Sequence, residues 1–350
     1  MKFLSLLTLP ILGLTVFGCS TGGSRGGGAA QPSAASPVTS GATTPAPAAP
    51  AAPTTSASGT SSPSNTSLAG LQVFPADNPW NTDISTYPVH PNSTNFIASI
   101  GAAKGLHPDF GTTYQGAPNG IPFVVVPLGQ AMAPINFVSY PGESDPGPYP
   151  VPANAPIEGG PQGTGDRHVI VVDPARRMLY ELFNARPDPV TGGWSAGSGA
   201  VFDLDSNALR PAGWTSADAA GLPVFPGLVR YEEVVGAGVI KHALRFTVAR
   251  SQRGYVHPAR HFASSSTDRN RPPMGLRLRL KASVDLSAFP AEAQVVLQAL
   301  KTYGMIVADN GSDWFLSGAP DPRWDDSKLR TLKQIKGSDF EVVNTGPIVR

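Results

Sequence analysis

The 350-residue chain has very little cysteine, and its N-terminal fifth has almost no charge. Cys19 is the only cysteine, so the chain cannot form an internal disulfide and its stability must come from packing. Residues 1–68 carry no charged side chains other than Lys2 and Arg25. The apolar run at residues 3–17 is too short to span a bilayer comfortably, and behind Lys2 it is typical of an export signal.

The run ends in Val16, Phe17, Gly18 and Cys19, which resemble the lipobox of bacterial lipoproteins. This resemblance covers about the first twenty residues. It implies that residues 1–18 are a signal peptide, that Cys19 is acylated, and that the exported protein is lipid-anchored to the outer or cell-surface membrane. Several acyl chains on one cysteine would make that anchoring stable.

Residues 19–68 are predicted to be a tether. They consist largely of Gly, Pro, Ser, Thr and Ala, which bury too little apolar surface to offset the entropy of ordering. Residues 69–350 contain no second tract of this kind and no internal repeat, so we expect a single globular domain. Basic and acidic residues nearly balance in this domain, and we therefore expect no nucleic-acid partner.

Strand signals dominate the domain. Short β-branched or alternating runs predict strands at residues 122–127, 135–140, 168–173, 178–183, 200–204, 239–248, 276–280 and 305–308. Helix signals predict helices at residues 94–104, 291–303 and 327–335. Arg277 and Arg279 alternate with leucines, which predicts a strand with one solvent-facing side. The expected fold is β-dominated (all-β or α+β): a β-sandwich-like domain with a few peripheral helices.

The strongest candidate site is a predicted hairpin that carries Asp166, His168 and Glu181. A two-residue turn at Pro174 and Ala175 would place His168 opposite Glu181, with Asp166 on the same face. A carboxylate beside an imidazole can perform general acid/base chemistry, because each group shifts the pKa of the other. The alternative is a structural His–Glu pair at the end of a strand.

A second group of candidates follows in the chain. Asp203 is a candidate catalytic carboxylate, and its alternative role is to cap a turn. Arg210 is expected to hold a substrate hydroxyl or carboxylate. Trp214, Asp218 and His242 are further candidates for substrate contacts, with a buried core position as the alternative for His242.

The histidines and tryptophans of the domain indicate which class of ligand, metal ion or sugar, the protein could bind. A zinc site at His168, His242, His257 and His261 remains a minor alternative, because no H-E-x-x-H pattern is present, and we expect no metal and no cofactor. The tryptophans all fall in loop-like segments, where indole rings can lie against sugar faces; they are Trp80, Trp194, Trp214, Trp314 and Trp324.

The segments SNALRPAGWTSADAAGLPVFPGLVRY and KHALRF are similar to a set of uncharacterised secreted bacterial proteins. The similarity extends over about residues 74–343. It implies a self-standing module that is used behind varied export signals, and it carries no reaction.

The sequence therefore favours a surface-tethered carbohydrate-active enzyme. We expect a glycoside hydrolase or polysaccharide lyase that acts on an extracellular polysaccharide or oligosaccharide. The alternative is a non-catalytic carbohydrate-binding or adhesive surface lipoprotein. Converging carboxylates beside His168 would favour the enzyme, and a flat aromatic platform would favour binding.

Overall fold

The computed structural model describes residue 68 and residues 70–350. The predicted signal peptide, the predicted acylation of Cys19 and nearly all of the predicted tether lie outside these described residues. In the described part of the chain, no helix combines the length and the apolar character needed to cross a membrane.

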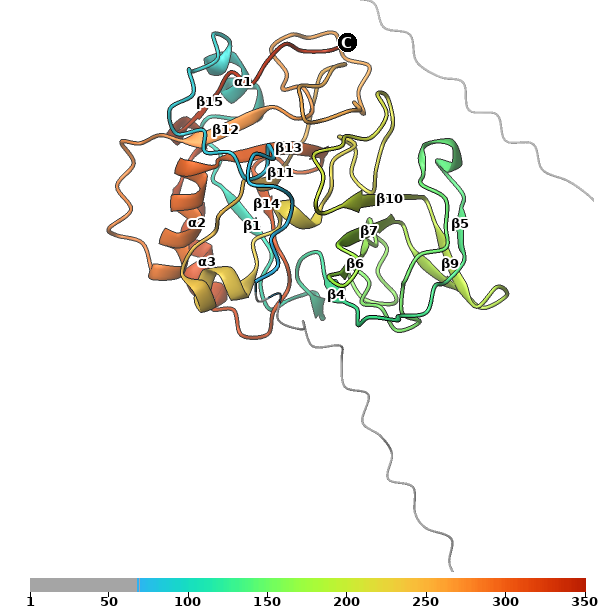
Figure 1. The fold of residues 1–350 in the computed structure, drawn as a ribbon. Coiled ribbons are helices and arrows are strands. Elements are labelled where there is room, and N and C mark those ends of the chain that lie inside the picture. Colours follow the sequence, from blue (N-terminus) through green and yellow to red (C-terminus); the bar gives the residue numbers. More distant parts are fainter. Residues whose placement is uncertain (1–67, 69) are drawn as a thin grey trace, which may run out of the picture. The chain divides into compact units, whose positions relative to one another are not determined.

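The larger of the two main sheets has six strands: β1 (His107–Asp109), β11 (Leu244–Val248), β12 (Arg277–Leu280), β13 (Met305–Asn310), β14 (Phe315–Ser317) and β15 (Phe340–Val342). Their order across the sheet is β1-β14-β11-β13-β12-β15 (Figure 1). β11 and β13 are parallel neighbours near the middle of the sheet and consist mainly of buried apolar residues. β13 ends in Asp309 and Asn310, and Arg245 is the second residue of β11. Arg245 and Asp309 belong to the site described below.

The second main sheet has four strands: β4 (Phe123–Val125), β6 (Val169–Asp173), β7 (Met178–Phe183) and β10 (Ser198–Asp203). Their order is β10-β7-β6-β4. All five residues of β6 are buried because both faces of this sheet are covered. Ile170 and Val172 join the larger hydrophobic core, which also contains Phe246 and Val307 of the six-stranded sheet. Val169 and Val171 pack into a smaller core on the opposite face.

Short strands complete the β structure. A three-stranded sheet has the order β5-β9-β8, and β2 pairs with β3. The bounds are β2 Thr113–Tyr114, β3 Ala117–Pro118, β5 Ile135–Phe137, β8 Arg186–Asp188 and β9 Gly193–Ala196. Trp194 of β9 is buried in the smaller core, so this sheet covers the outer face of β6 and β7.

The helices are few and short. They are α1 Ser93–Ile100, α2 Ala291–Thr302 and α3 Asp326–Arg330, with single turns η1 Pro141–Glu143, η2 Phe225–Gly227, η4 Thr331–Gln334 and η5 Gly337–Asp339, and a π-helix, η3 Glu232–Ala237. Figure 1 shows α2 and α3 together beside the six-stranded sheet. α2 buries Val296, Leu297 and Leu300, and burial of each such side chain contributes about 1.5–3 kcal/mol.

The structure confirms the β-dominated fold with few helices. Each of the eight predicted strand regions contains a strand, and each of the three predicted helices is present with shifted ends. The strands that the sequence did not predict are β1, β2, β3, β8, β9, β14 and β15. These are two to four residues long, which is too short to show a clear alternation.

The predicted register of the β6–β7 hairpin is wrong. Asp173 pairs with Met178, so residues 174–177 form a four-residue turn and Ile170, rather than His168, lies opposite Glu181. The longer turn is stabilised because Asp173 Oδ1 accepts a hydrogen bond from the Arg176 backbone N–H at 3.0 Å. The register differs by two residues, so His168 and Glu181 still belong to the same face of the sheet.

The expectation of a solvent-facing side on β12 is also wrong. Arg277 is only 4% exposed, and its guanidinium donates hydrogen bonds to the carbonyl groups of Pro79, Thr82 and Tyr303. Arg279 likewise donates to carbonyl groups of residues 84–87. The segment at residues 79–87 therefore covers this face of the strand.

Candidate active site

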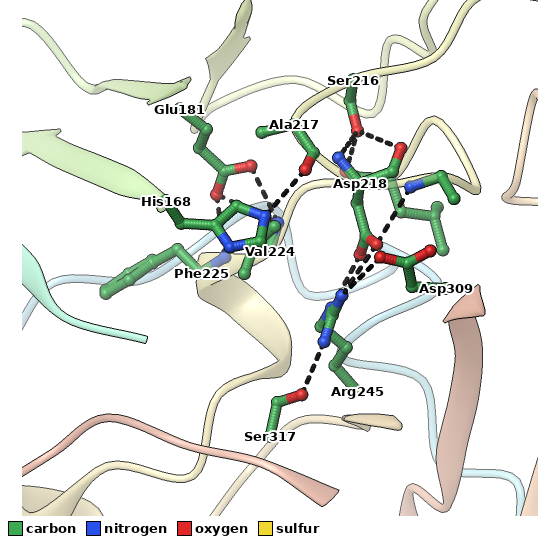
Figure 2. Close-up of polar contacts among 12 residues, drawn as sticks. His168, Glu181, Ser216, Ala217, Asp218, Val224, Phe225, Arg245, Asp309 and Ser317 are labelled. Atoms are coloured by element: carbon green, nitrogen blue, oxygen red, sulfur yellow. Dashed lines mark hydrogen bonds and ion pairs between the residues drawn. The ribbon is translucent and has the colours of Figure 1, made fainter. Parts of the chain in front are cut away.

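His168, just before β6, is the buried centre of the candidate site. Its Nδ1 lies 2.7 Å from Glu158 Oε2, and its Nε2 lies 2.9 Å from the carbonyl oxygen of Ala217, the contact drawn in Figure 2. Both partners are acceptors, so both ring nitrogens must carry a proton, and the ring is an imidazolium. Burial lowers the pKa of His168, but the Glu158 carboxylate outweighs burial and raises it to about 9.

Glu158 is the partner of this cation and reaches solvent. Burial disfavours its charged form, but the His168 imidazolium and its hydrogen bonds hold the pKa of Glu158 below its usual value. The side chain is 26% exposed. Oε2 accepts hydrogen bonds from the ring and the backbone of His168, whereas Oε1 has no partner among residues 68 and 70–350. Glu158 therefore has one ionised oxygen available for chemistry.

Arg167 holds the loop that connects Glu158 to His168. Its backbone is left-handed, with φ 53°. The buried guanidinium donates to the carbonyl groups of Gly160, Pro161, Gly163 and Ala185. The loop is thereby closed on itself, and the positions of its two acidic ends, Glu158 and Asp166, are constrained.

Asp218 and Arg245 form a buried ion pair at the base of the site. Arg245 Nε lies 2.8 Å from Asp218 Oδ2, and Nη2 lies 2.9 Å from Oδ1, so the pairing is bidentate (Figure 2). Arg245 Nη1 also donates to Ser317 Oγ at 2.6 Å. Ser216 Oγ accepts a hydrogen bond from the Asp218 backbone N–H and orders the turn that carries the aspartate.

Asp309, at the end of β13, stands on the other side of Arg245. Its Oδ2 lies 3.5 Å from Arg245 Nη2, and the side chain is 21% exposed. Burial and the Asp218 carboxylate raise the pKa of Asp309 to about 7, although Arg245 opposes them. Desolvation by neighbouring atoms and the Glu158 carboxylate also raise the pKa of Asp109, an exposed residue at the end of β1, although Arg245 opposes them.

Two carboxyl groups of the site therefore have pKa values shifted in opposite directions: that of Asp309 is raised, and that of Glu158 is lowered. Asp309 keeps its proton up to about pH 7, while Glu158 is ionised well below that pH. Such a separation is the usual requirement for assigning one carboxyl group as an acid and another as a base or nucleophile. We define the central cluster as Asp109, Glu158, Asp166, His168, Asp218, Arg245 and Asp309.

Three of the residues singled out in the sequence belong to this cluster. His168 is its centre, and Asp218 holds its arginine. Asp166 is exposed and lies near enough to raise the pKa values of His168 and Asp309.

Glu181 lies beside the cluster and is fully buried. Its carboxylate accepts hydrogen bonds from the backbone N–H groups of Val224 and Phe225 at 2.8 to 3.0 Å (Figure 2). Those contacts join β7 to η2, and this geometry gives Glu181 a structural role.

The other candidates lie apart from the cluster. Asp203 is exposed and accepts a hydrogen bond from the Asp205 backbone N–H. This contact corresponds to the alternative role of Asp203, which was to cap a turn. Arg210 is buried and uses its donors on Asp145 and on the carbonyl groups of Glu143 and Thr215. Trp214 is half-buried, with its ring 5.7 Å from the Arg210 guanidinium.

His242 belongs to a second polar group with Arg230 and Glu233. Its Nε2 lies 3.2 Å from Glu233 Oε1, and the Arg230 Nη2 donor is 2.6 Å from the same oxygen. Burial raises the pKa of Glu233, but the two basic neighbours lower it to about 2. These residues line a cavity of about 440 Å³ that contains no residue of the central cluster.

Sequence reasoning missed Glu158, Asp109, Arg245 and Asp309. The clearest signal was Arg245, an arginine within the apolar strand sequence LRFTV, because a guanidinium buried with such a strand needs polar partners. Asp309 directly follows the buried run MIVA at the end of β13. Glu158 and Asp109 have no comparable local signal.

Tryptophans do not form a surface platform. The expectation that their rings meet sugars is wrong for four of the five, which are at most 5% exposed: Trp80, Trp194, Trp314 and Trp324. In the described part of the chain, no three His, Cys, Asp or Glu side chains are arranged to hold a metal ion.

Comparison of the chain with protein-family models, with curated proteins and with solved structures found no match.

Proposed function

We propose that the domain is a glycoside hydrolase that acts on an extracellular polysaccharide, with Asp309 as general acid and Glu158 as general base or nucleophile. The observation that carries this proposal is a pair of solvent-reaching carboxyl groups, each held beside its own buried cation: Glu158 lies 2.7 Å from His168, and Asp309 lies 3.5 Å from Arg245. The pKa values of the two groups differ from the ordinary ones in opposite directions, which supports the assignment of an acid and a base. Glycoside hydrolysis requires one protonated and one ionised carboxyl group on either side of the scissile bond.

The buried cations support these roles. The His168 imidazolium keeps Glu158 ionised and holds Oε2, which leaves Oε1 for a water molecule or the anomeric carbon. Arg245 is held by Asp218 and Ser317, so it presents a fixed positive charge to Asp309 after that residue has given up its proton. In this proposal Asp109 contacts substrate, which is supported by the exposure of its carboxyl group.

The two alternatives have less support. A binding module that uses an aromatic platform would need exposed rings, and four of the tryptophans are buried. Elimination from a uronate would need a cation directed at the substrate carboxylate, and the donors of Arg210 are already engaged within the protein.

The proposed location is the cell surface, through acylation at Cys19 behind the residue 1–18 signal peptide. Mass spectrometry of the mature N-terminus tests this part on its own. We expect a lipid-modified cysteine as the first residue, and an unmodified cysteine or cleavage elsewhere would disprove the anchor.

The hydrolase proposal is tested by incubating the purified domain with a panel of neutral, amino-bearing and uronate polysaccharides. New reducing ends without new ultraviolet absorbance are expected on at least one polymer. Absorbance from unsaturated products would instead identify a lyase, and the absence of both signals on the whole panel would overturn the enzymatic assignment.

A further inference from the structure

The cavity that His242 lines has the size of a small-molecule site. Its volume is about 440 Å³, and ligand pockets typically measure roughly 300–1,000 Å³. Its charged or titratable lining residues are Arg230, Glu233, Lys241 and His242. These side chains share one cavity, so a single ligand can meet several of them.

The polar part of this cavity is held in place before any ligand arrives. Arg230 and His242 are only 4% and 6% exposed, whereas the Glu233 side chain is 23% exposed. Arg230 Nη1 donates to the carbonyl oxygen of Phe225 at 2.9 Å, and Nη2 donates to Glu233 Oε1 at 2.6 Å. Glu233 belongs to the π-helix η3, a conformation that is frequent at functional sites.

The hydrogen bonds at His242 Nε2 compete with one another. Nδ1 lies 2.8 Å from the carbonyl oxygen of Ala243 and therefore carries a proton. Nε2 lies 2.9 Å from the donor Arg230 Nη2 and 3.2 Å from both carboxylate oxygens of Glu233. A single nitrogen cannot both accept from the arginine and donate to the carboxylate.

Either state of His242 leaves one polar atom of this group without a partner in the part of the chain that the structure describes. If Nε2 accepts from Arg230, Glu233 Oε2 has no donor. If Nε2 is protonated and donates to Glu233, one N–H of Arg230 Nη2 has no acceptor. A hydroxyl group can donate as well as accept, so it can complete the group in both states.

The charges of the cavity disfavour an ionic ligand. A ligand ammonium would meet the positive charges of Arg230 and Lys241. A ligand carboxylate would meet Glu233, which is ionised because its two basic neighbours lower its pKa to about 2. Leu71 and Val73 also line the cavity, and such apolar side chains can pack against the C–H groups of a sugar ring.

We propose that this cavity is a binding site for a neutral sugar, with one sugar hydroxyl bound by Glu233 and the Arg230–His242 pair. The cavity contains no residue of the central cluster, so this inference goes beyond the proposed hydrolase and does not depend on catalysis.

The first test compares sugars that share a ring and differ in charge. Glucose, galactose and mannose, with the uronate and the amino form of each, are titrated into the purified protein while the ring nitrogen signals of His242 are followed by NMR. At least one neutral sugar should shift these signals, and its two ionic forms should bind more weakly. No shift with any neutral sugar, or tighter binding of an ionic form, would overturn the inference.

The second test blocks the cavity. Val239 lines it and is 43% exposed, so Val239→Phe can narrow the cavity without disturbing the core. Val235→Phe is the matched control, because Val235 is 44% exposed but does not line this cavity. Val239→Phe should abolish binding of the neutral sugar, while Val235→Phe binds it like the parent. Binding retained in Val239→Phe, or an equal loss in both variants, would refute the site.

Glu233→Gln tests the hydrogen bond itself. Loss of a hydrogen bond to a charged group should weaken binding of the neutral sugar about tenfold or more. The variant is assayed under conditions in which its circular dichroism matches that of the parent; if it does not fold, the valine variants decide. Unchanged affinity in folded Glu233→Gln would refute the role of Glu233. None of these readouts requires turnover, so this inference and the hydrolase proposal can fail separately.

Discussion

Substituting Asp218→Asn should destabilise the domain severely, because it removes the counter-charge of a buried cation. The side chains of Asp218 and Arg245 are 0% and 4% exposed, and their two contacts are 2.8 and 2.9 Å long. Breaking a buried pair by removing one partner typically costs about 3–5 kcal/mol of unfolding free energy, since the remaining charge cannot be hydrated.

The matched control is Asp205→Asn. Asp205 pairs with Arg177 at a similar distance, 2.7 Å, but these side chains are 62% and 30% exposed. An exposed pair contributes about 0–1 kcal/mol. Urea unfolding of the parent and the two variants, with comparison of both midpoints and slopes, should therefore give a loss for Asp218→Asn several times larger than for Asp205→Asn.

The same variant has a second, electrostatic consequence. The negative charge of Asp218 raises the pKa of Asp309. Asp218 also pairs with Arg245, whose positive charge lowers the pKa of Asp309. Replacing Asp218 with Asn should therefore lower the pKa of Asp309 from about 7, as measured by carboxyl-carbon NMR titration. Equal stability losses in the two variants, or an unchanged Asp309 titration in folded Asp218→Asn, would refute our description of the Asp218–Arg245–Asp309 group.

Two further predictions concern buried groups beside the site. Glu181→Gln should lower the free energy of unfolding by about 1–3 kcal/mol, because an amide NH₂ then faces the backbone donors of Val224 and Phe225; an unchanged urea midpoint would contradict this. His168→Gln should be destabilising below about pH 6.5, with the difference from the parent disappearing as pH rises through about 9, because the raised pKa stabilises only the protonated folded state. A difference independent of pH in urea unfolding would contradict the charged assignment.

Local patterns were sufficient for the strands but not for their register. The runs at residues 168–173 and 178–183 are β-branched or apolar enough to identify β6 and β7. Their pairing depends on a turn in which Asp173 caps the chain and Arg177 adopts a left-handed φ of 55°. A non-glycine residue in that conformation has no sequence signature, so a two-residue turn was predicted.

Only part of the candidate site could be predicted from the sequence. His168 and Asp166 are adjacent to a strongly predicted strand, and Asp218 lies in a distinctive loop. Asp109 and Asp309 come from the ends of strands that are 200 residues apart in the chain, and only the folded structure places these strands in one sheet. Similarly, the solvent-facing assignment of Arg277 failed because residues 79–87, far away in the chain, cover that face.

The most direct test of the proposed hydrolase is the turnover of Asp309→Asn and Glu158→Gln on the polysaccharide that the parent cleaves. Asp188→Asn is the control, because this half-buried aspartate lies in β8 outside the central cluster. Each site variant, assayed under conditions in which its circular dichroism matches that of the parent, should lose about 10²- to 10⁴-fold in rate, while the control stays within a few-fold of the parent. The rate of the parent should also fall above about pH 7 as Asp309 loses its proton. Site variants that remain as active as Asp188→Asn would contradict the assignment of Asp309 and Glu158 as the catalytic pair.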